Sequence, residues 1–159
     1  MVVVVIVGVL SAVGAPSIAR LLQNASSQRA LVESAATVST ARDSARGFGT
    51  CLEYLVEPPP PRKGPYSVRV FAINCPDDGT SVRKEIGVPQ ALSPKLTELL
   101  IRPVRDGYPG DTIAAIHFDR SGGLYDPVAE LRLEGIYDGE PRHFSVFPAA
   151  GTVSIEERK

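Results

Sequence analysis

The first nineteen residues of the chain form an uninterrupted apolar run. Residues 1–19 contain no charged side chain, and the first one along the chain is Arg20. A helix needs about 20 mostly apolar residues to cross a bilayer, and this run is just long enough. A segment that is apolar on every face suits a membrane or a helix bundle better than a small core. The pattern therefore predicts a hydrophobic helix over residues 1–19 that either crosses a membrane or lies in the core of a helix bundle.

Two other interpretations of this run remain open. A secretory signal peptide would carry a basic stretch before the apolar one and a small-residue cleavage site after it. No Lys or Arg precedes the run, although Ala12, Gly14 and Ala15 resemble a cleavage site. A buried core helix is the third interpretation, but a chain of this size is too small to surround one completely. The valine-rich start favours a strand in water, whereas in lipid the backbone must bond internally, which favours a helix.

Several positions of this segment are expected to contact neighbouring helices. Gly8 and Gly14 are small residues that let two helices approach closely. Pro16 lacks a backbone N–H and clashes with the preceding turn, so a kink or a local break is expected there. The residues assigned to the contact with the membrane or with neighbouring helices are Val2, Val5, Ile6, Gly8, Val9, Leu10, Gly14 and Pro16.

Residues 20–47 continue the helix with an amphipathic pattern. Apolar and small residues recur at three- and four-residue steps, which is typical of a helix with one buried face. The face expected to pack on the rest of the protein contains Ile18, Leu21, Leu22, Ala25, Val32, Ala35, Ala36 and Ser39. Gly47 and Gly49 follow the basic residue Arg46, and this combination indicates the end of the helix.

Beyond the helix, short β-prone runs alternate with turn residues. Strands are expected at 52–56, 66–73, 81–87, 112–119, 129–137, 142–147 and 152–156. Proline-rich residues 57–61 predict an extended loop, and turns are expected at 74–79, 121–123 and 149–151. Asp138 and Gly139 between two β-prone runs strongly indicate a hairpin. Ser93 and Pro94 predict the start of a short helix over 93–99, and residues 103–111 predict a loop.

These elements predict an α+β fold in which a long N-terminal helix packs on a β-rich head over residues 48–159. A chain of 159 residues is long enough for one globular domain besides the helix, and 43% hydrophobic residues can supply its core. The formal charge of −1 gives no overall attraction to nucleic acid or acidic lipid.

The N-terminal pattern resembles that of a known superfamily. Gly8, the surrounding apolar stretch and Pro16 resemble the N-terminal helix of type IV pilins and type II secretion pseudopilins. In those proteins a short basic leader precedes a Phe-Thr-Leu-x-Glu start that a dedicated peptidase cleaves and methylates. Neither the leader nor that start occurs in this sequence, and aligning Gly8 and Pro16 places Met1 about six residues inside the mature end. We therefore expect a late-assigned start or a trimmed chain.

Two C-terminal segments resemble one branch of that superfamily. Residues 112–123, with Phe118, Asp119 and Gly122, resemble the "strand, Phe, Asp, x, x, Gly" segment of the GspH/FimT pseudopilins. Residues 142–153 resemble the final hairpin of the same family. The resemblance covers residues 1–50 and 112–157 and leaves the middle of the chain unassigned.

The resemblance implies a structural subunit rather than an enzyme. It implies a GspH/FimT-like minor pilin in the tip or priming complex of a type IV pilus. Its partners would be other minor pilins, the major pilin, the inner-membrane assembly platform, and inner-membrane lipid before assembly. Its head would lie in the periplasm and later at the pilus tip on the cell surface. A type II secretion tip pseudopilin with pseudopilin partners is one alternative, and a membrane-anchored periplasmic binding module, including a DNA-uptake minor pilin, is another.

Cys51 and Cys75 are the only cysteines of the chain. An even count in an exported protein indicates a disulfide, here between the helix exit and the end of an expected strand. In the loop-entropy model such a bridge contributes about 3 kcal/mol. Two reduced buried thiols are the alternative if the head is not exposed to the periplasm.

The sequence offers little catalytic or metal-binding chemistry. His117, Asp119 and Ser121 alternate along one expected strand and its turn, whereas the members of a catalytic triad come from separate elements. The loop aspartates lack the Asp-x-Asp-x-Asp-Gly spacing of a calcium loop, and the cysteines and histidines lack zinc-site spacing. The basic pairs Arg62-Lys63 and Arg83-Lys84 are isolated. We therefore expect no enzymatic activity, no cofactor or metal, and no nucleic-acid partner.

Overall fold

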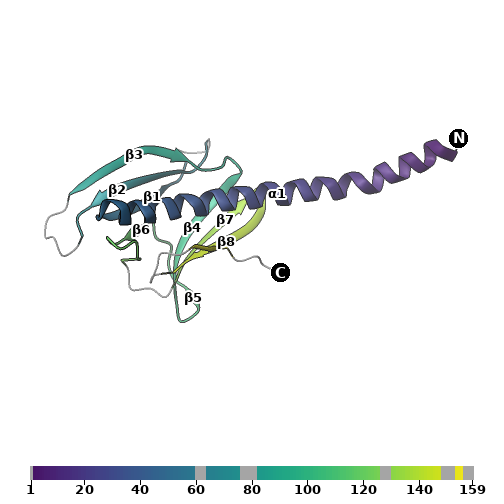
Figure 1. Ribbon diagram of the computed structural model, residues 1–159. Coiled ribbons are helices and arrows are strands. Elements are labelled where there is room, and N and C mark those ends of the chain that lie inside the picture. Colours follow the sequence, from purple (N-terminus) through teal and green to yellow (C-terminus); the bar gives the residue numbers. More distant parts are fainter. Residues whose placement is uncertain (1, 60–63, 76–81, 126–129, 148–152, 156–159) are drawn as a thin grey trace.

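The computed structural model describes the backbone of residues 2–59, 64–75, 82–125, 130–147 and 153–155, and the side chains of these residues from Leu21 onward. One long helix, α1 (Val2–Phe48), precedes two antiparallel sheets. Figure 1 shows the C-terminal half of α1 lying along the head, whereas the N-terminal half projects from it. The predicted α+β fold with a β-rich head is confirmed.

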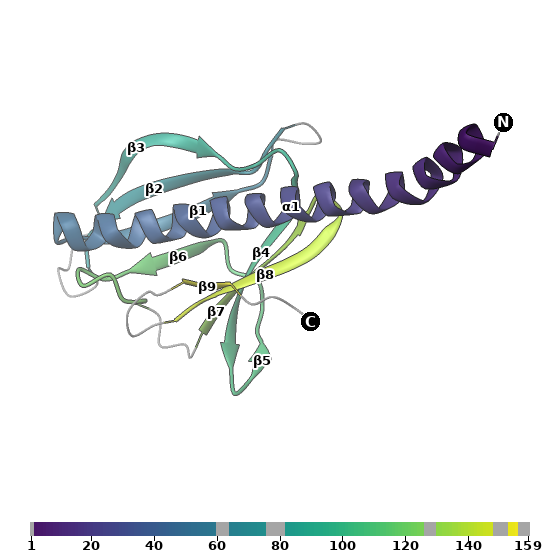
Figure 2. The same ribbon diagram turned by 45° about the vertical axis from the view of Figure 1, so that its right-hand side comes forward.

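The helix continues through Pro16, so the expected local break does not occur. Figure 2 shows that α1 instead curves along its projecting part. A proline inside a helix removes one hydrogen bond and crowds the preceding turn, and bending relieves both without ending the helix. At the other end, Gly49 adopts a φ of 61° and the Thr50 N–H donates to the Ala45 carbonyl at 3.2 Å. This is a Schellman-type cap, and it confirms the predicted glycine stop.

The first sheet lies behind the C-terminal half of α1 in the view of Figure 2. Its strand order is β3-β2-β1-β6, and its strands are β1 (Cys51–Glu57), β2 (Ser67–Ile73), β3 (Arg83–Ala91) and β6 (Ala115–Phe118). Strand β3 runs further than the predicted 81–87 and includes Pro89. A proline is tolerated there because β3 is an edge strand of this sheet and needs fewer N–H donors. Tyr54 and Phe118 from this sheet are almost fully buried in the core.

The second sheet forms the other part of the head. Its strand order is β5-β4-β7-β8-β9, and its strands are β4 (Leu96–Arg105), β5 (Tyr108–Pro109), β7 (Glu130–Tyr137), β8 (Glu140–Val146) and β9 (Val153–Ile155). Alternate residues of β7 are buried, among them Leu131, Leu133 and Tyr137. The predicted hairpin at Asp138 and Gly139 is confirmed, because both residues have positive φ and Tyr137 pairs with Glu140 across them.

Two predictions for residues 93–111 are wrong. The expected helix over 93–99 is a single turn, in which the Leu96 N–H donates to the Ser93 carbonyl, and then β4 begins. Pairing with β7 and burial of Leu96, Leu99 and Ile101 outweigh the local helix signal. The expected loop over 103–111 contains the end of β4 and all of β5. The expected loop at 57–61 and the turns at 74–79 and 149–151 lie wholly or partly outside the described residues.

Candidate functional site: the faces of the helix and its junction with the head

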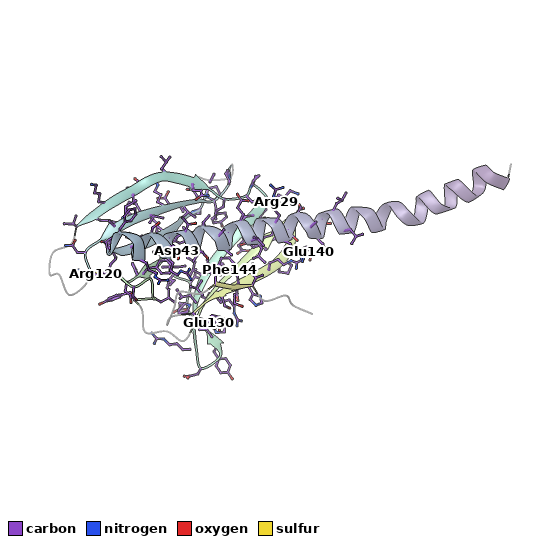
Figure 3. The ribbon with its side chains drawn as sticks, viewed as in Figure 1. Arg29, Asp43, Arg120, Glu130, Glu140 and Phe144 are labelled. Atoms are coloured by element: carbon purple, nitrogen blue, oxygen red, sulfur yellow. A yellow bond between two sulfur atoms is a disulfide. The ribbon has the colours of Figure 1, made fainter. Side chains whose placement is uncertain are left out.

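The side of α1 that packs on the head is formed by small residues. Its members are less than 9% exposed and follow one another at helical spacing. They are Ser27, Ala30, Leu31, Ser34, Ala35, Thr37, Val38, Ala41 and Ala45. Small side chains let the helix backbone approach the strands closely, and the larger residues of the head, such as Phe144, fill the space beneath it (Figure 3). We call this set the buried face.

The hydroxyl groups of the buried face are satisfied locally. Ser34 Oγ donates to the Ala30 carbonyl at 3.0 Å, and Thr37 Oγ1 donates to the Ser34 carbonyl at 2.8 Å. Thr37 also shares a hydrogen bond of 2.7 Å with the Tyr54 hydroxyl. Burial raises the pKa of Tyr54 above its ordinary value, and the Thr37 bond offsets only part of this rise. Because these polar atoms have partners, the serines and threonine of the helix can be buried at low cost.

The packing face predicted from the sequence is wrong. Leu21, Leu22 and Val32 are 68%, 67% and 53% exposed, and Ala36 is also exposed. Of the periodic set, only Ala35 belongs to the buried face, and Ile18 lies outside the described side chains. At 3.6 residues per turn Val32 and Ala36 lie on the side of α1 opposite Ser34 and Val38. Leu21 and Leu22 continue this side into the stretch 21–25, all of which is exposed. We call Leu21, Leu22, Val32 and Ala36 the open face.

The open face follows directly on the apolar leading segment along the same helix. The side chains of residues 1–20 lie outside the described part of the structure, so the contacts expected for residues 1–19 are not tested there. Among the residues whose side chains are described, no helix is long and apolar enough to cross a membrane.

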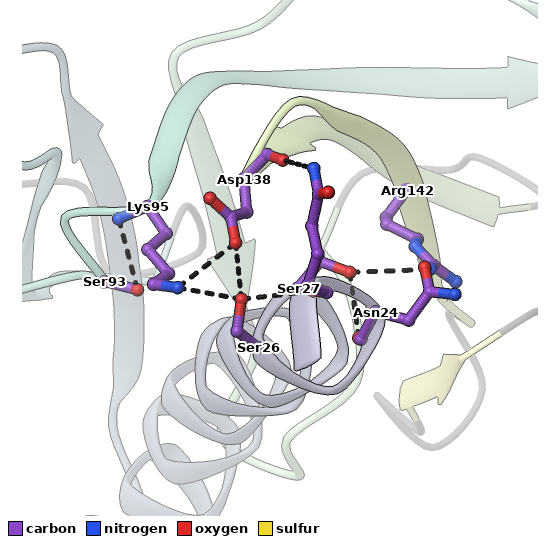
Figure 4. Close-up of polar contacts among 8 residues, drawn as sticks. Asn24, Ser26, Ser27, Ser93, Lys95, Asp138 and Arg142 are labelled. Carbon is purple, nitrogen blue, oxygen red and sulfur yellow. Dashed lines mark hydrogen bonds and ion pairs between the residues drawn. The ribbon is translucent and has the colours of Figure 1, made fainter. Parts of the chain in front are cut away.

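A polar cluster joins the helix to the head where α1 leaves it (Figure 4). The Asp138 carboxylate, at the tip of the β7–β8 hairpin, accepts hydrogen bonds from Ser26 Oγ at 2.5 Å and Lys95 Nζ at 3.1 Å. Lys95 Nζ also donates to Ser26 Oγ at 2.8 Å, and Gln23 donates to the Asp138 carbonyl at 3.0 Å. We call Gln23, Ser26, Lys95 and Asp138 the exit cluster. It links one turn of α1 to two separate turns of the head and thereby fixes where the helix leaves it.

The exit cluster favours the ionised form of its acid. Hydrogen bonds from Ser26, and then from Lys95, lower the pKa of Asp138 below its ordinary 3.8. Beside the cluster, an Arg142 nitrogen lies 3.4 Å from Ser27 Oγ and 3.5 Å from Asn24 Oδ1. Sequence reasoning missed these contacts because they join residues 43 to 118 positions apart, although the Asp-Gly signal did place Asp138 in a turn.

The predicted disulfide between Cys51 and Cys75 is present. Cys51 begins β1 and pairs in register with Ile73, and Cys75 follows the end of β2. The bridge therefore ties together the ends of two neighbouring strands just after the C-terminal end of α1. Both cysteines are buried, and Arg120 Nε donates to the Cys75 sulfur at 3.1 Å.

The Phe-Asp-x-x-Gly segment has a structural explanation. Phe118 is fully buried, and the Asp119 carboxylate accepts hydrogen bonds from the Ser121 and Gly123 backbone N–H groups at 2.7 and 2.9 Å. Burial raises the pKa of Asp119, but these bonds and the Ser121 hydroxyl bond together lower it overall. Gly122 has a φ of 81°, and a Cβ added there would lie 2.6 Å from the Arg46 side chain. The segment therefore holds a tight turn against the end of α1.

The same geometry argues against a Ser-His-Asp site. Ser121 Oγ donates directly to the Asp119 carboxylate at 2.6 Å, whereas a triad places the histidine between these two groups. His117 lies on β6, opposite Glu53 of β1. No cluster of three or more His, Cys, Asp or Glu side chains that could hold a metal occurs among the described residues.

A long helix lying on two antiparallel sheets defines a type IV pilin-like fold. The comparison with solved structures finds this arrangement in the type IV minor pilin FimU of Pseudomonas aeruginosa, with a TM-score of 0.52 and 15% sequence identity. The match covers 82% of this chain and 87% of that one. At this identity the likeness concerns the fold. No protein-family model and no curated protein sequence matches the chain.

Proposed function

We propose that this chain is a non-catalytic structural subunit of a type IV pilus-like filament. The observation that carries the proposal is the open face of α1. It presents large apolar side chains to solvent: Val32 lies where the other side of α1 is packed on the head, and Leu21 and Leu22 lie in the stretch 21–25, which is exposed throughout. The preceding residues 1–19 are apolar throughout. A helix of this kind needs partners along most of its length.

The energetics favour helical neighbours as those partners. Burying one large aliphatic side chain contributes about 1.5–3 kcal/mol relative to water. Leu21, Leu22 and Val32 are more than half exposed, so they can still gain most of this energy. In the proposed filament, the leading segments and the open faces of several subunits pack together. Before assembly, the leading segment would be held in the inner membrane.

Within this class we propose a GspH/FimT-like minor pilin in a tip or priming complex. The 112–123 segment supports this assignment, because each residue of its motif has a structural role in the turn at Asp119. The partners would be other minor pilins, the major pilin and the inner-membrane assembly platform. The head would occupy the periplasm first and the pilus tip on the cell surface afterwards.

A type II secretion tip pseudopilin has the same physical requirements. The two possibilities differ in phenotype: loss of the chain should reduce surface pili in the first case and protein export in the second. The DNA-uptake alternative receives less support, because Arg83 is held at 2.8 Å by Glu53 and lies over the Phe71 ring at 3.9 Å. Arg62 and Lys63 lie outside the described residues.

The proposal is tested by placing charge on the open face. Leu22→Glu and Val32→Glu should each leave the folded head unchanged. Neither variant should be incorporated into the filaments that are sheared from cells of the native host. Val88→Glu is the control, because Val88 is 88% exposed and belongs to strand β3 rather than to the open face. It should be incorporated normally.

A deletion provides an independent test. Removal of residues 1–16 should yield a soluble, folded head that no longer co-purifies with filaments. Normal incorporation of this deletion, or of both open-face variants, would contradict the proposed function.

A further inference from the structure

Two hairpin turns of the head contain the same Asp-Gly pair. Asp106 and Gly107 join β4 to β5, and we call this the first turn. Asp138 and Gly139 join β7 to β8, and we call this the second turn. The φ angles are 51° and 81° in the first turn and 54° and 81° in the second, as in a type I′ hairpin. Because the two turns share these residues and φ angles, a difference in their chemistry must come from their surroundings.

An Asp-Gly pair contains two groups that can react with each other. The backbone nitrogen of the glycine can attack the side-chain carboxyl carbon of the aspartate, because glycine has no Cβ to hinder the approach. The new C–N bond closes a five-membered succinimide ring, and the proton of the nitrogen leaves with the hydroxyl of the protonated carboxyl as water. Addition of water to the α-carbonyl then opens the ring as isoaspartate, in which the main chain runs through the side-chain carbon. The sequence of steps needs only water.

At the second turn, the surrounding residues hold the groups that this reaction has to move. The Asp138 carboxylate accepts hydrogen bonds from Ser26 Oγ at 2.5 Å and from Lys95 Nζ at 3.1 Å (Figure 4). The Asp138 N–H donates to the Lys95 carbonyl at 2.7 Å, and the Asp138 carbonyl accepts from Gln23 at 3.0 Å. The side-chain bonds lower the pKa of Asp138, and its ionised form lacks the hydroxyl that must leave. They also oppose rotation of the carboxyl toward the Gly139 nitrogen.

At the first turn, the aspartate side chain is not held in this way. Asp106 is exposed, and among the described residues its carboxylate has no hydrogen-bond or ion-pair partner. The first turn also closes a shorter ladder, because β5 has two residues whereas β8 has seven. Figure 2 shows the β4–β5 hairpin projecting from the head. Local opening is easier where fewer backbone hydrogen bonds must break, so Gly107 can leave the turn geometry at lower cost than Gly139.

We propose that the first turn is a site of spontaneous isoaspartate formation in the folded chain, and that the exit cluster protects the second turn from the same reaction. At the first turn, isoaspartate adds one atom to the main chain of a projecting hairpin and leaves the helix contacts intact. At the second turn, it would displace the carboxylate that Ser26 and Lys95 bind, and would thereby loosen the junction of α1 with the head. The exit cluster thus has a chemical role besides its structural one. This inference involves neither the open face nor filament assembly.

The test compares the two turns within one sample. The full chain, folded in a mild detergent, is incubated at neutral pH in water labelled with heavy oxygen, and its peptides are analysed by mass spectrometry with electron-transfer fragmentation. Every ring opening incorporates the label, whichever carbonyl the water attacks. The first turn should react roughly tenfold faster than the second or more, because charge-assisted hydrogen bonds must break before Asp138 can react. Asp78-Gly79, a third such pair that lies outside the described residues, falls in a separate peptide.

The unfolded chain supplies the baseline for this comparison. In concentrated urea the two turns should react at similar rates, because both aspartates precede glycine and the exit cluster no longer exists. A difference of the same size in urea would assign the effect to the flanking sequence and overturn the proposal.

A double variant tests the protective role of the exit cluster. Ser26→Ala with Lys95→Met removes both donors to the carboxylate of the second turn, so its rate should rise toward that of the first. Thr40→Ala with Lys84→Met makes the same changes outside the exit cluster and both turns, and should leave both rates as in the parent chain. Near-UV circular dichroism checks the fold, and Lys95→Met alone repeats the comparison if the double variant unfolds.

Three results would contradict the proposal. They are equal rates at the two turns of the folded parent chain, absence of isoaspartate from the first turn, and an unchanged rate at the second turn in the folded variant that lacks the donors. Because none of these measurements uses filaments, their outcome is independent of whether the proposed function is correct.

Discussion

The buried face and the open face of α1 differ in residue type. Hydrophobicity alone would place the large apolar residues on the buried face, but they lie on the open face. The buried face consists mainly of alanine, serine and threonine, whereas the open face carries Leu21, Leu22 and Val32. The head already contributes large core residues such as Tyr54, Phe118 and Phe144. The helix must fit closely against them, so it contributes small side chains.

This difference shows that the most apolar face of a helix need not be the one that packs on its own domain. Steric fit selects the buried face, and serine and threonine can belong to it because their hydroxyls donate to carbonyls of the preceding helical turn. The large apolar residues left on the open face then become available for contacts with other chains.

The largest expected effect comes from a charge on the buried face. Val38→Asp should destabilise the head by about 3–5 kcal/mol, because Val38 is fully buried and the carboxylate would have no partner. Val32→Asp places the same change on the open face and should alter stability by at most about 0.5 kcal/mol. Urea unfolding of the full chains in mild detergent, followed by near-UV circular dichroism, measures both. Equal losses would contradict the assignment of the two faces.

The next largest effect concerns the sheet on which the buried face rests. Replacing both Cys51 and Cys75 by serine opens a bridge between residues 24 positions apart and should cost about 3 kcal/mol. Reduction of the parent chain should lower its free energy of unfolding in urea by a similar amount. The same treatment should not change the stability of the double variant. A double variant as stable as the oxidised parent chain would show that the bridge does not support the helix–sheet packing.

A smaller effect is expected at the boundary between the packed and projecting parts of α1. Ser26→Ala removes the hydroxyl that joins Lys95 to Asp138 and should cost about 1 kcal/mol in urea unfolding. Thr40→Ala is the control, because among the described residues the exposed Thr40 hydroxyl bonds only to the Ala36 carbonyl within the helix. A cost at Thr40 equal to that at Ser26 would argue against a role for the exit cluster.

The smallest effect is a pH dependence of the same cluster. The pKa of Asp138 is lowered in the folded chain, so its contribution to stability is complete above its ordinary pKa of 3.8 and disappears as pH falls through the lower folded value. The parent chain should therefore exceed Asp138→Asn in stability at pH 6, and the difference should vanish in strong acid. Urea midpoints measured at several pH values test this. A difference that persists in acid would assign the effect to the turn rather than to the charge.

Local signals in the sequence predicted much of the head. The Asp138-Gly139 hairpin, the Gly49 stop, the disulfide and most of the strands were predictable, because each depends on a turn residue, on alternation or on a cysteine count. The segment 93–99 was not, because its helix signal is local whereas its pairing with β7 is a long-range contact. The exit cluster depends on contacts between distant residues, which no spacing in the sequence reveals.

The sequence by itself determined that a long, largely apolar helix precedes a β-rich head, because periodicity and turn chemistry are properties of neighbouring residues. Only the tertiary structure decided which side of that helix meets the head. That choice depends on the shape of the sheets on which it packs, where close packing favours Ala30, Ala41 and Ala45 over Val32.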